Sequence, residues 1–238
     1  MSVYAVVPVK SPLKSKTRLS VVLSLQERQS LALFMLEDVL KALKSSVVYQ
    51  ICVISSDVIV QALANKSRVE YLPESQLGLN QAIMQATEWC IKNNAESIFV
   101  LPADIPLITQ EDINQIVKLG SEKTSVVISP SANGGTNALF QKPPNLIPAC
   151  FGLHSFMKHV NKATAKKISI KFYCSKRVTL DIDSLSDLKN FLSIKSQTMS
   201  RRFLEQIKTC NRLVNFRSCN VDAAVPKIEW LNFNQMSG

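Results

Sequence analysis

The stretch VLPADIPLIT, residues 100–109, decides the fold of this chain. Apolar residues 97–101 predict a buried strand, and Asp104 follows it between two prolines that restrict the backbone. Thr109 then begins a predicted helix that runs to residue 118. An acidic side chain at the end of a strand and before a helix is typical of the ligand crevice in an open α/β sheet.

The same alternation of short apolar runs and helical patterns continues in both directions along the chain. Because strands that alternate with helices form parallel sheets, the sequence predicts an α/β fold: a mostly parallel sheet with helices on both faces. Ser24 with Glu27 and Ser184 with Asp187 mark two of the helix starts. Strands are predicted at residues 3–9, 50–55, 69–72, 97–101, 126–129, 138–141, 169–173 and 178–182, and helices at 26–43, after Asp57, at 79–92, 109–118 and 153–167, and after Ser184.

Length, composition and charge limit the architecture and the partners. The 238 residues, 46% of them hydrophobic, fit one sizeable domain, which we assign to residues 1–195. The αβ alternation stops there, and residues 196–238 are expected to form a basic C-terminal appendage. A net charge of +10 favours an anionic partner, either nucleic acid or a phosphorylated small molecule. Nucleic acid is the less favoured partner, because the basic residues are scattered and do not interleave with aromatic ones.

The chain carries no pattern that indicates a membrane segment or a secretion signal. No apolar run approaches the roughly 18 residues of a membrane helix, and Lys10 and Lys14 follow the first apolar segment in place of a cleavage site. The six cysteines form no C-x-x-C pair and predict reduced thiols without a zinc site. We expect a cytoplasmic protein with no membrane partner, and a homodimer is one assembly that the sequence leaves open.

Three carboxylates stand where two predicted strands end. Alternation places Asp181 and Asp183 on one face of the strand predicted at 178–182, and Asp104 ends another strand. Two carboxylates on one face repel each other unless a cation lies between them. A magnesium ion that bridges triphosphate oxygens needs such carboxylates, so we predict Mg²⁺ as cofactor and Asp104, Asp181 and Asp183 as its ligands. The alternative is that Asp183 only precedes a helix and that Asp181 faces solvent.

Four cations follow the first predicted strand: Lys10, Lys14, Lys16 and Arg18. Lysine and arginine neutralise a triphosphate at short range, and these residues lie where the crevice of an α/β sheet opens. The segment is not a Walker loop, since it contains no glycine. The alternative is a solvated basic loop.

Small and hydroxyl residues form two further candidate anion sites. The loop at 133–137 contains two glycines followed by Thr136 and Asn137, and glycines let backbone N–H groups approach an anion. Gly152 and Ser155 stand at the start of a predicted helix, which is a natural place for a phosphate. Each signal alone is equally compatible with an ordinary turn.

Gly78 and Asn80 stand at another helix start, where Asn80 either reads a base edge or caps the helix. The two histidines, His154 and His159, receive no catalytic role, because a lone histidine is more often structural.

Taken together, seven segments resemble the 2-phospho-L-lactate guanylyltransferase family, which acts in coenzyme F-420 biosynthesis. The resemblance covers about residues 1–194. The segments, in the order of the family, are PVKSPLKSKTRL (8–19), LSLQERQSLALFMLEDVL (23–40), GLNQAI (78–83), VLPADIPLIT (100–109), GGTNALF (134–140), PACFGLHSF (148–156) and TLDIDSLSDL (179–188).

The resemblance implies a nucleotide-diphospho-sugar transferase-like fold and a GTP-dependent reaction. A phosphorylated three-carbon acid would attack the α-phosphorus of GTP, giving a guanylated product and pyrophosphate. Within the family the acid is 2-phospho-L-lactate, phosphoenolpyruvate or 3-phospho-D-glycerate. The loop before Thr136 departs from the family pattern, which leaves the acid open. The alternatives are a molybdenum-cofactor or sugar-phosphate nucleotidyltransferase and, outside enzymes, a basic nucleic-acid-binding protein.

The resemblance also implies roles for particular residues. We expect Asp104, Lys16 and Arg18 to be catalytic. By motif, the acid would be bound by Thr136, Gly152 and Ser155 with the adjacent Asn137, the nucleotide by Lys10, Lys16, Arg18, Gly78 and Asn80, and magnesium by Asp104, Asp181 and Asp183.

Overall fold

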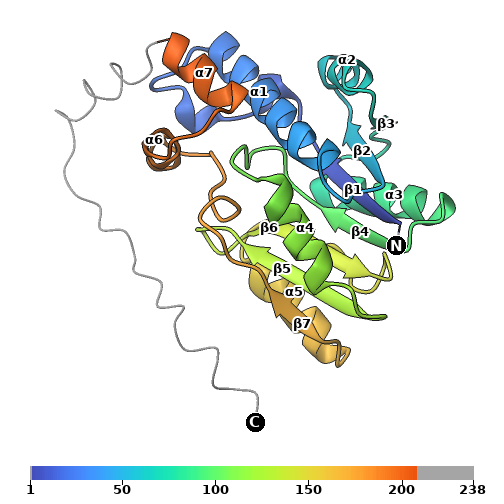
Figure 1. Cartoon of the computed structure of the whole chain (residues 1–238). Coiled ribbons are helices and arrows are strands. Elements are labelled where there is room, and N and C mark those ends of the chain that lie inside the picture. The colour runs from blue at the N-terminus through green and yellow to red at the C-terminus, as the bar shows by residue number, and fades with distance from the viewer. Residues whose placement is uncertain (1, 208–238) are drawn as a thin grey trace.

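The computed structural model describes residues 2–207, and a single seven-stranded sheet runs through its centre (Figure 1). Every neighbouring pair of strands is parallel except those of β6, which runs antiparallel to β4 and β5. The predicted α/β fold with a mostly parallel sheet is therefore confirmed. The sheet order is β3-β2-β1-β4-β6-β5-β7, with β1 Val3–Pro8, β2 Gln50–Ser55, β3 Glu70–Pro73, β4 Ser97–Val100, β5 Ser125–Pro130, β6 Thr136–Lys142 and β7 Ile170–Phe172.

Helices cover both faces of the sheet and bury two separate cores. Alternate residues of β1 contribute to each: Val3, Ala5 and Val7 to one, Tyr4 and Val6 to the other. Figure 1 shows α1 and α4 on one side of the sheet and α5 on the other. The first core is covered by α1 (Leu25–Lys44), α2 (Val58–Lys66) and α4 (Gln110–Leu119), and the second by α3 (Leu79–Lys92) and α5 (Ser155–Ala165).

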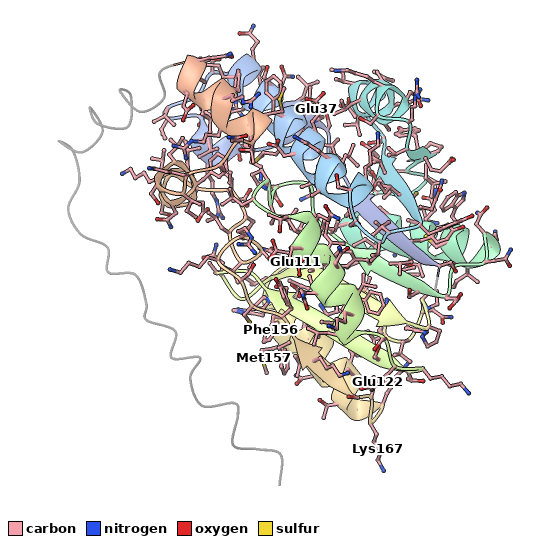
Figure 2. The ribbon with its side chains drawn as sticks, viewed as in Figure 1. Glu37, Glu111, Glu122, Phe156, Met157 and Lys167 are labelled. Carbon is pink, nitrogen blue, oxygen red and sulfur yellow. The ribbon has the colours of Figure 1, made fainter. Side chains whose placement is uncertain are left out.

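Figure 2 shows the side chains that line these helices. Glu111 lies on α4, and Phe156 lies on α5, where its ring is 5.7 Å from that of Phe172 on β7. Lys167 points away from the molecule beyond the end of α5. Phe156 at the start of α5 and Ala163 near its end are both buried against the sheet.

A third apolar cluster lies beside the sheet and fixes the basic segment after β1. Leu19 is fully buried there with Met35 of α1 and Phe191. The segment contains two short 3₁₀ turns, η1 (Pro12–Lys14) and η2 (Thr17–Leu19), and the cluster is closed by α6 (Leu185–Ser193) and α7 (Met199–Gln206). Because Leu19 is anchored, the turn that carries Lys16 and Arg18 just before it is held at a fixed place.

Helix α7 follows residue 195 and packs along α1, with the rings of Phe34 and Phe203 5.1 Å apart (Figure 1). Leu204 of this helix is fully buried. The division of the chain at 195/196 stays a prediction, and the part of the expected appendage from residue 208 onward lies outside the described residues.

The strand predicted at residues 178–182 is wrong. Val178, Leu180 and Ile182 are buried in alternation, which is the pattern that suggested a strand. The segment lies beside loops, and isolated backbone hydrogen bonds join it to them in place of the regular ladder of a β-sheet. The Ile182 N–H donates to the Asp104 carbonyl, and the Ala132 N–H donates to the Thr179 carbonyl. Burial alternation without a partner strand does not make a sheet.

The predicted helix starts are confirmed. Ser24 with Glu27, Thr109 with Asp112, and Ser184 with Asp187 each form a reciprocal capping box. Within residues 2–207, none of the helices has the length and apolar character needed to span a bilayer.

Candidate active site

A pocket of about 370 Å³ opens where β1 and β4 end. This is the edge at which an open α/β sheet binds its ligands, because parallel strands all present their carboxyl ends there. Apolar walls come from Met35, Leu79 and Phe151. The polar lining consists of Lys10, Lys14, Ser15, Lys16, Thr17, Arg18, Asp104 and Asp183.

The reversed direction of β6 brings a second group of residues to the same edge. Since β6 is antiparallel to β4, its first residues, Thr136 and Asn137, lie beyond the paired end of β4, near the loop that carries Asp104. The register pairs Val100 with Leu139, three residues after the start of β6. The candidate acid-binding residues and the carboxylates are therefore neighbours in the fold.

Lys16 lies between two of the three predicted metal ligands. Its Nζ atom is 2.7 Å from Asp104 Oδ2 and 2.8 Å from Asp183 Oδ1, and only 6% of its side chain is exposed. Burial alone would lower the pKa of Lys16, but the two carboxylates outweigh it and hold the pKa above its ordinary value. Lys16 is thus a fixed ammonium ion that separates two carboxylates.

The backbone at Lys16 is unusual and supports this position. Its φ of 54° is in the left-handed region, between the two 3₁₀ turns. The turn at Thr17–Leu19 continues into the buried Leu19. This turn carries the lysine side chain inward while Lys10, Lys14 and Arg18 stay exposed along the pocket.

Asp181 lies apart from the lysine and is held by Asn137. The Asn137 Nδ2 group donates to the Val178 carbonyl at 2.9 Å and to Asp181 Oδ1 at 3.2 Å. Burial, and next the charge of Asp104, raise the pKa of Asp181 to about 6. The side chain of Asn137 therefore contacts the carboxylate segment rather than an open surface.

These residues fit a magnesium ion in their chemistry. Among residues 2–207, no three side chains of His, Cys, Asp or Glu stand close enough together to form a ready metal site. Carboxylate oxygens are nevertheless the ligands that Mg²⁺ prefers. The magnesium site stays a prediction, and the Lys16 ammonium lies between two of its predicted ligands.

Thr136 and Ser155 come together from β6 and α5. Ser155 Oγ donates to Thr136 Oγ1 at 3.2 Å, and Thr136 Oγ1 is 3.0 Å from Nδ1 of the buried His159. Gly152 lies in the exposed loop before α5 with a φ of +115°, a conformation that side chains rarely adopt. Its carbonyl accepts from the Ser155 N–H and so closes the turn that begins α5.

Asn80 neither caps α3 nor presents a free amide. The residue at the N-cap of α3 is Gly78, with a φ of +123°. The Asn80 side chain donates to the Phe151 carbonyl at 3.1 Å and accepts from the Phe151 N–H at 2.7 Å. Asn80 thereby ties the start of α3 to the loop that carries Gly152.

Sequence reasoning missed one cluster that positions the carboxylates. The buried carboxylate of Asp112 accepts from Arg177 Nε at 2.7 Å, from Arg177 Nη2 at 2.8 Å and from the Tyr173 hydroxyl at 2.7 Å. Hydrogen bonds from Arg177 and Thr109 overcome burial and hold the pKa of Asp112 far below its usual range. The cluster fixes the start of the segment that leads to Asp181 and Asp183. The sequence around Asp112 does not reveal this role, because a partner 65 residues away leaves no local pattern.

Comparison with known proteins supports the fold and the family. The family model for CofC-like guanylyl transferases matches residues 3–220. The 2-phospho-L-lactate guanylyltransferase of Methanocaldococcus sp. (strain FS406-22) is 38% identical over 201 residues, which cover 84% of this chain and 85% of that protein. The phosphoenolpyruvate guanylyltransferase of Rubrobacter xylanophilus is 35% identical over 189 residues, which cover 79% of this chain and 92% of that protein.

Solved structures show the same fold at lower sequence identity. A protein of Desulfovibrio desulfuricans G20, described as a nucleotide-diphospho-sugar transferase, matches with a TM-score of 0.77 and 16% identity over 93% of this chain and all of that one. A cytidylyltransferase of Leptospira borgpetersenii matches with a TM-score of 0.56 and 18% identity over 94% of this chain and all of that one. The predicted nucleotide-diphospho-sugar transferase-like fold is confirmed.

Proposed function

Because the chain belongs to the CofC-like guanylyl transferase family, we propose that it transfers GMP from GTP to the phosphate of a small phosphorylated three-carbon acid in coenzyme F-420 biosynthesis. An oxygen of the acid's phosphate attacks the α-phosphorus and forms a new P–O–P link. The bond from the α-phosphorus to the bridging oxygen breaks, and pyrophosphate leaves with that electron pair. The relatives point to 2-phospho-L-lactate as the first acceptor to test and phosphoenolpyruvate as the second, ahead of 3-phospho-D-glycerate.

The observation that carries the proposal is the pocket at the ends of β1 and β4. Lys10, Lys14 and Arg18 line it as exposed cations beside apolar side chains of Leu79 and Phe151. A nucleoside triphosphate presents the matching combination, with an anionic chain at one end and a flat base with apolar faces at the other. We assign Lys10 and Arg18 to the triphosphate, and Gly78 and Asn80 to the side of the base.

Lys16 and Asp104 occupy the centre of this arrangement. The ammonium of Lys16 is fixed before any ligand binds, so it stabilises charge that develops on the phosphates without first having to reorganise. Asp104, Asp181 and Asp183 would hold magnesium, which when bound neutralises triphosphate oxygens and favours the departure of pyrophosphate. Asn137 contributes by holding Asp181, rather than by binding the acid directly.

Thr136, Ser155 and Gly152 form the side of the site to which we assign the acid. The Thr136 hydroxyl and the open glycine turn at Gly152 can hydrogen-bond a carboxylate or phosphate without steric hindrance, while Ser155 donates its hydroxyl proton to Thr136. The phosphate of the acceptor is largely a dianion near neutral pH, so the attack requires no general base. Catalysis then depends on positioning and on charge neutralisation.

A product assay tests this function. The purified protein is given GTP, Mg²⁺ and each of the three acids in turn, and both pyrophosphate and the guanylated product are measured. We expect equal amounts of the two with one acid, and much slower turnover when ATP, CTP or UTP replaces GTP. Turnover with sugar phosphates or molybdopterin and not with the acids would favour the other nucleotidyltransferase classes.

Two further expectations stay predictions within this proposal. Light scattering after gel filtration tests the homodimer. Binding to labelled duplex and single-stranded DNA or RNA over a range of salt tests the nucleic-acid alternative, which requires a steep loss of affinity as salt increases.

A further inference from the structure

His159 makes two hydrogen bonds that together fix the position of its ring proton. The side chain is fully buried on α5. The backbone N–H of Cys150 donates to His159 Nε2 at 3.0 Å. Because a backbone N–H is only a donor, Nε2 must carry a lone pair and no proton.

The proton of the neutral ring is therefore on Nδ1. Burial lowers the pKa of His159 to about 4, so the ring is neutral at physiological pH. Nδ1 lies 3.0 Å from Thr136 Oγ1 and donates to it. The rings of His159 and Phe151 pack in a T-shaped arrangement with their centres 4.9 Å apart, which helps to hold the imidazole in place.

The hydroxyl oxygen of Thr136 accepts a second hydrogen bond, from Ser155. Ser155 Oγ also donates to Thr136 Oγ1, so this oxygen accepts two hydrogen bonds. A hydroxyl has two acceptor positions and one proton, and here both acceptor positions are filled. The proton of Thr136 is left to point out of the cluster. Of the three side chains Thr136 is also the most accessible, at 7% exposed against 1% for Ser155 and none for His159.

We propose that His159 is a positioning residue for the acceptor acid: its Nδ1–H fixes Thr136 as an obligate hydrogen-bond donor to a carboxylate or phosphate oxygen. The proposal rests on the assignment of Thr136 to the acid side of the site. It explains why a buried histidine lies directly behind the hydroxyl of Thr136. It also predicts selectivity, because a Thr136 oxygen with no free lone pair rejects a ligand that offers only a donor.

The first test measures the ring proton directly and does not depend on activity. The sequence contains only two histidines, so a protein labelled with ¹⁵N-histidine gives two imidazole signals. The variant His154→Asn assigns the other ring, and asparagine suits its left-handed backbone. We expect His159 to stay in the neutral Nδ1–H form from pH 8 down to pH 5. The Nε2–H form, or a charged ring near neutral pH, would overturn the proposal.

The second test separates the two nitrogen atoms with a matched pair of variants. The amide of His159→Asn can replace Nδ1 as donor to Thr136, whereas the longer His159→Gln places its amide near Nε2. We expect His159→Gln to raise the KM for the acid by about tenfold and His159→Asn to raise it by less than about threefold. The two variants differ by the loss of one hydrogen bond to a charged group. The KM for GTP should change little in either variant.

Melting temperatures of both variants provide the control for folding. If Asn and Gln change the KM for the acid equally, or change the two KM values together, His159 has only a structural role and the proposal fails. If the wild-type protein forms no guanylated product with any acid, the proposed function fails instead. The state of the ring proton then still decides whether His159 directs the hydroxyl of Thr136.

Discussion

Lys16 links the basic segment after β1 to two carboxylates that come from distant parts of the chain. Buried lysines are rare unless paired, and this one has a carboxylate on each of two sides. The arrangement holds Asp104 and Asp183 side by side without mutual repulsion. It also places a fixed positive charge at the centre of the pocket.

The variant Lys16→Met tests this role. It keeps most of the side-chain volume and removes the charge, so Asp104 and Asp183 repel each other and the phosphates lose a fixed ammonium group. We expect kcat to fall by about a hundredfold or more. Lys14→Met is the matched control, because Lys14 lines the same pocket at an exposed position. Its main effect should be a modest rise in the KM for GTP. Equal effects of the two substitutions on kcat would contradict a special role for Lys16.

We expect the hydroxyl of Thr136 to bind the acid directly. The variant Thr136→Val replaces the hydroxyl with a methyl group of similar shape and should raise the KM for the acid by about tenfold. Thr136→Ser keeps the hydroxyl and should remain much closer to the wild type. Steady-state kinetics with each substrate varied in turn gives both constants. A rise in the KM for GTP as large as that for the acid would remove Thr136 from the acid side.

Among the elements, α7 is attached to α1 by one carboxylate. Asp38 on α1 accepts from the Met199 N–H at 2.7 Å, from the Ser200 N–H at 3.0 Å and from the Ser200 hydroxyl at 2.6 Å. These N–H groups belong to the first turn of α7 and have no partner within the helix. Asp38 therefore caps a helix more than 160 residues further along the chain.

The variant Asp38→Ala should destabilise the protein by about 1–3 kcal/mol, because it leaves two N–H groups unsatisfied at a nearly buried position. Urea unfolding followed by circular dichroism measures the loss. Ser200→Ala removes only the hydroxyl bond and should cost less. A stability for Asp38→Ala equal to that of the wild type would show that α7 is held by apolar packing alone.

The segment from Tyr173 to Asp183 depends on Asp112 of α4. Replacing Arg177 with Met leaves the buried carboxylate without its cation. Since nearly half of the arginine side chain is exposed, we expect a loss of about 1–3 kcal/mol, below the full cost of breaking a buried ion pair. Because the segment carries Asp181 and Asp183, kcat should fall as well. The exposed neighbour Lys176 provides the control: Lys176→Met should change neither quantity measurably.

At the scale of the whole molecule, the buried His159 gives stability a dependence on pH. Its pKa is about 4 in the folded protein and near 6.5 when unfolded, so between these values only the unfolded chain takes up the proton. Stability is therefore complete above pH 6.5 and is lost as the pH falls toward 4. Within residues 2–207, the hydrogen-bond partners of the ring are the Thr136 hydroxyl and the Cys150 backbone N–H, and neither group titrates in this range.

The free energy of unfolding of the wild type should fall by about 2 kcal/mol more than that of His159→Asn between pH 7 and pH 5. Urea titrations of both proteins at the two pH values provide the comparison. The variant His159→Asn serves as the reference for the wild type, because every other titrating group is common to both chains. Parallel losses in the two proteins would place the folded-state pKa of His159 near its ordinary value.

The sequence by itself determined the elements and the family. Apolar periodicity, the proline-flanked Asp104 and the capping pairs at Ser24, Thr109 and Ser184 are local patterns, and they predicted the strands, the helix starts and the edge of the sheet that carries the pocket. The ordered motifs predicted the guanylyltransferase family, which the comparisons confirm. The local patterns gave a wrong prediction at residues 178–182, where burial alternates but the described part of the chain provides no partner strand.

Only the tertiary structure decided which side chains meet. Lys16 contacts carboxylates 88 and 167 residues away, and Asn80 bonds to a backbone 71 residues away. That a lysine lies between two of the aspartates, and that an asparagine side chain bonds to a loop backbone, depends on how distant segments cross. The same holds for the ring proton of His159, because the Cys150 N–H and the Thr136 hydroxyl that fix it come from separate parts of the chain. Periodicity and caps reflect interactions within a few residues, whereas these contacts exist only once the sheet has assembled.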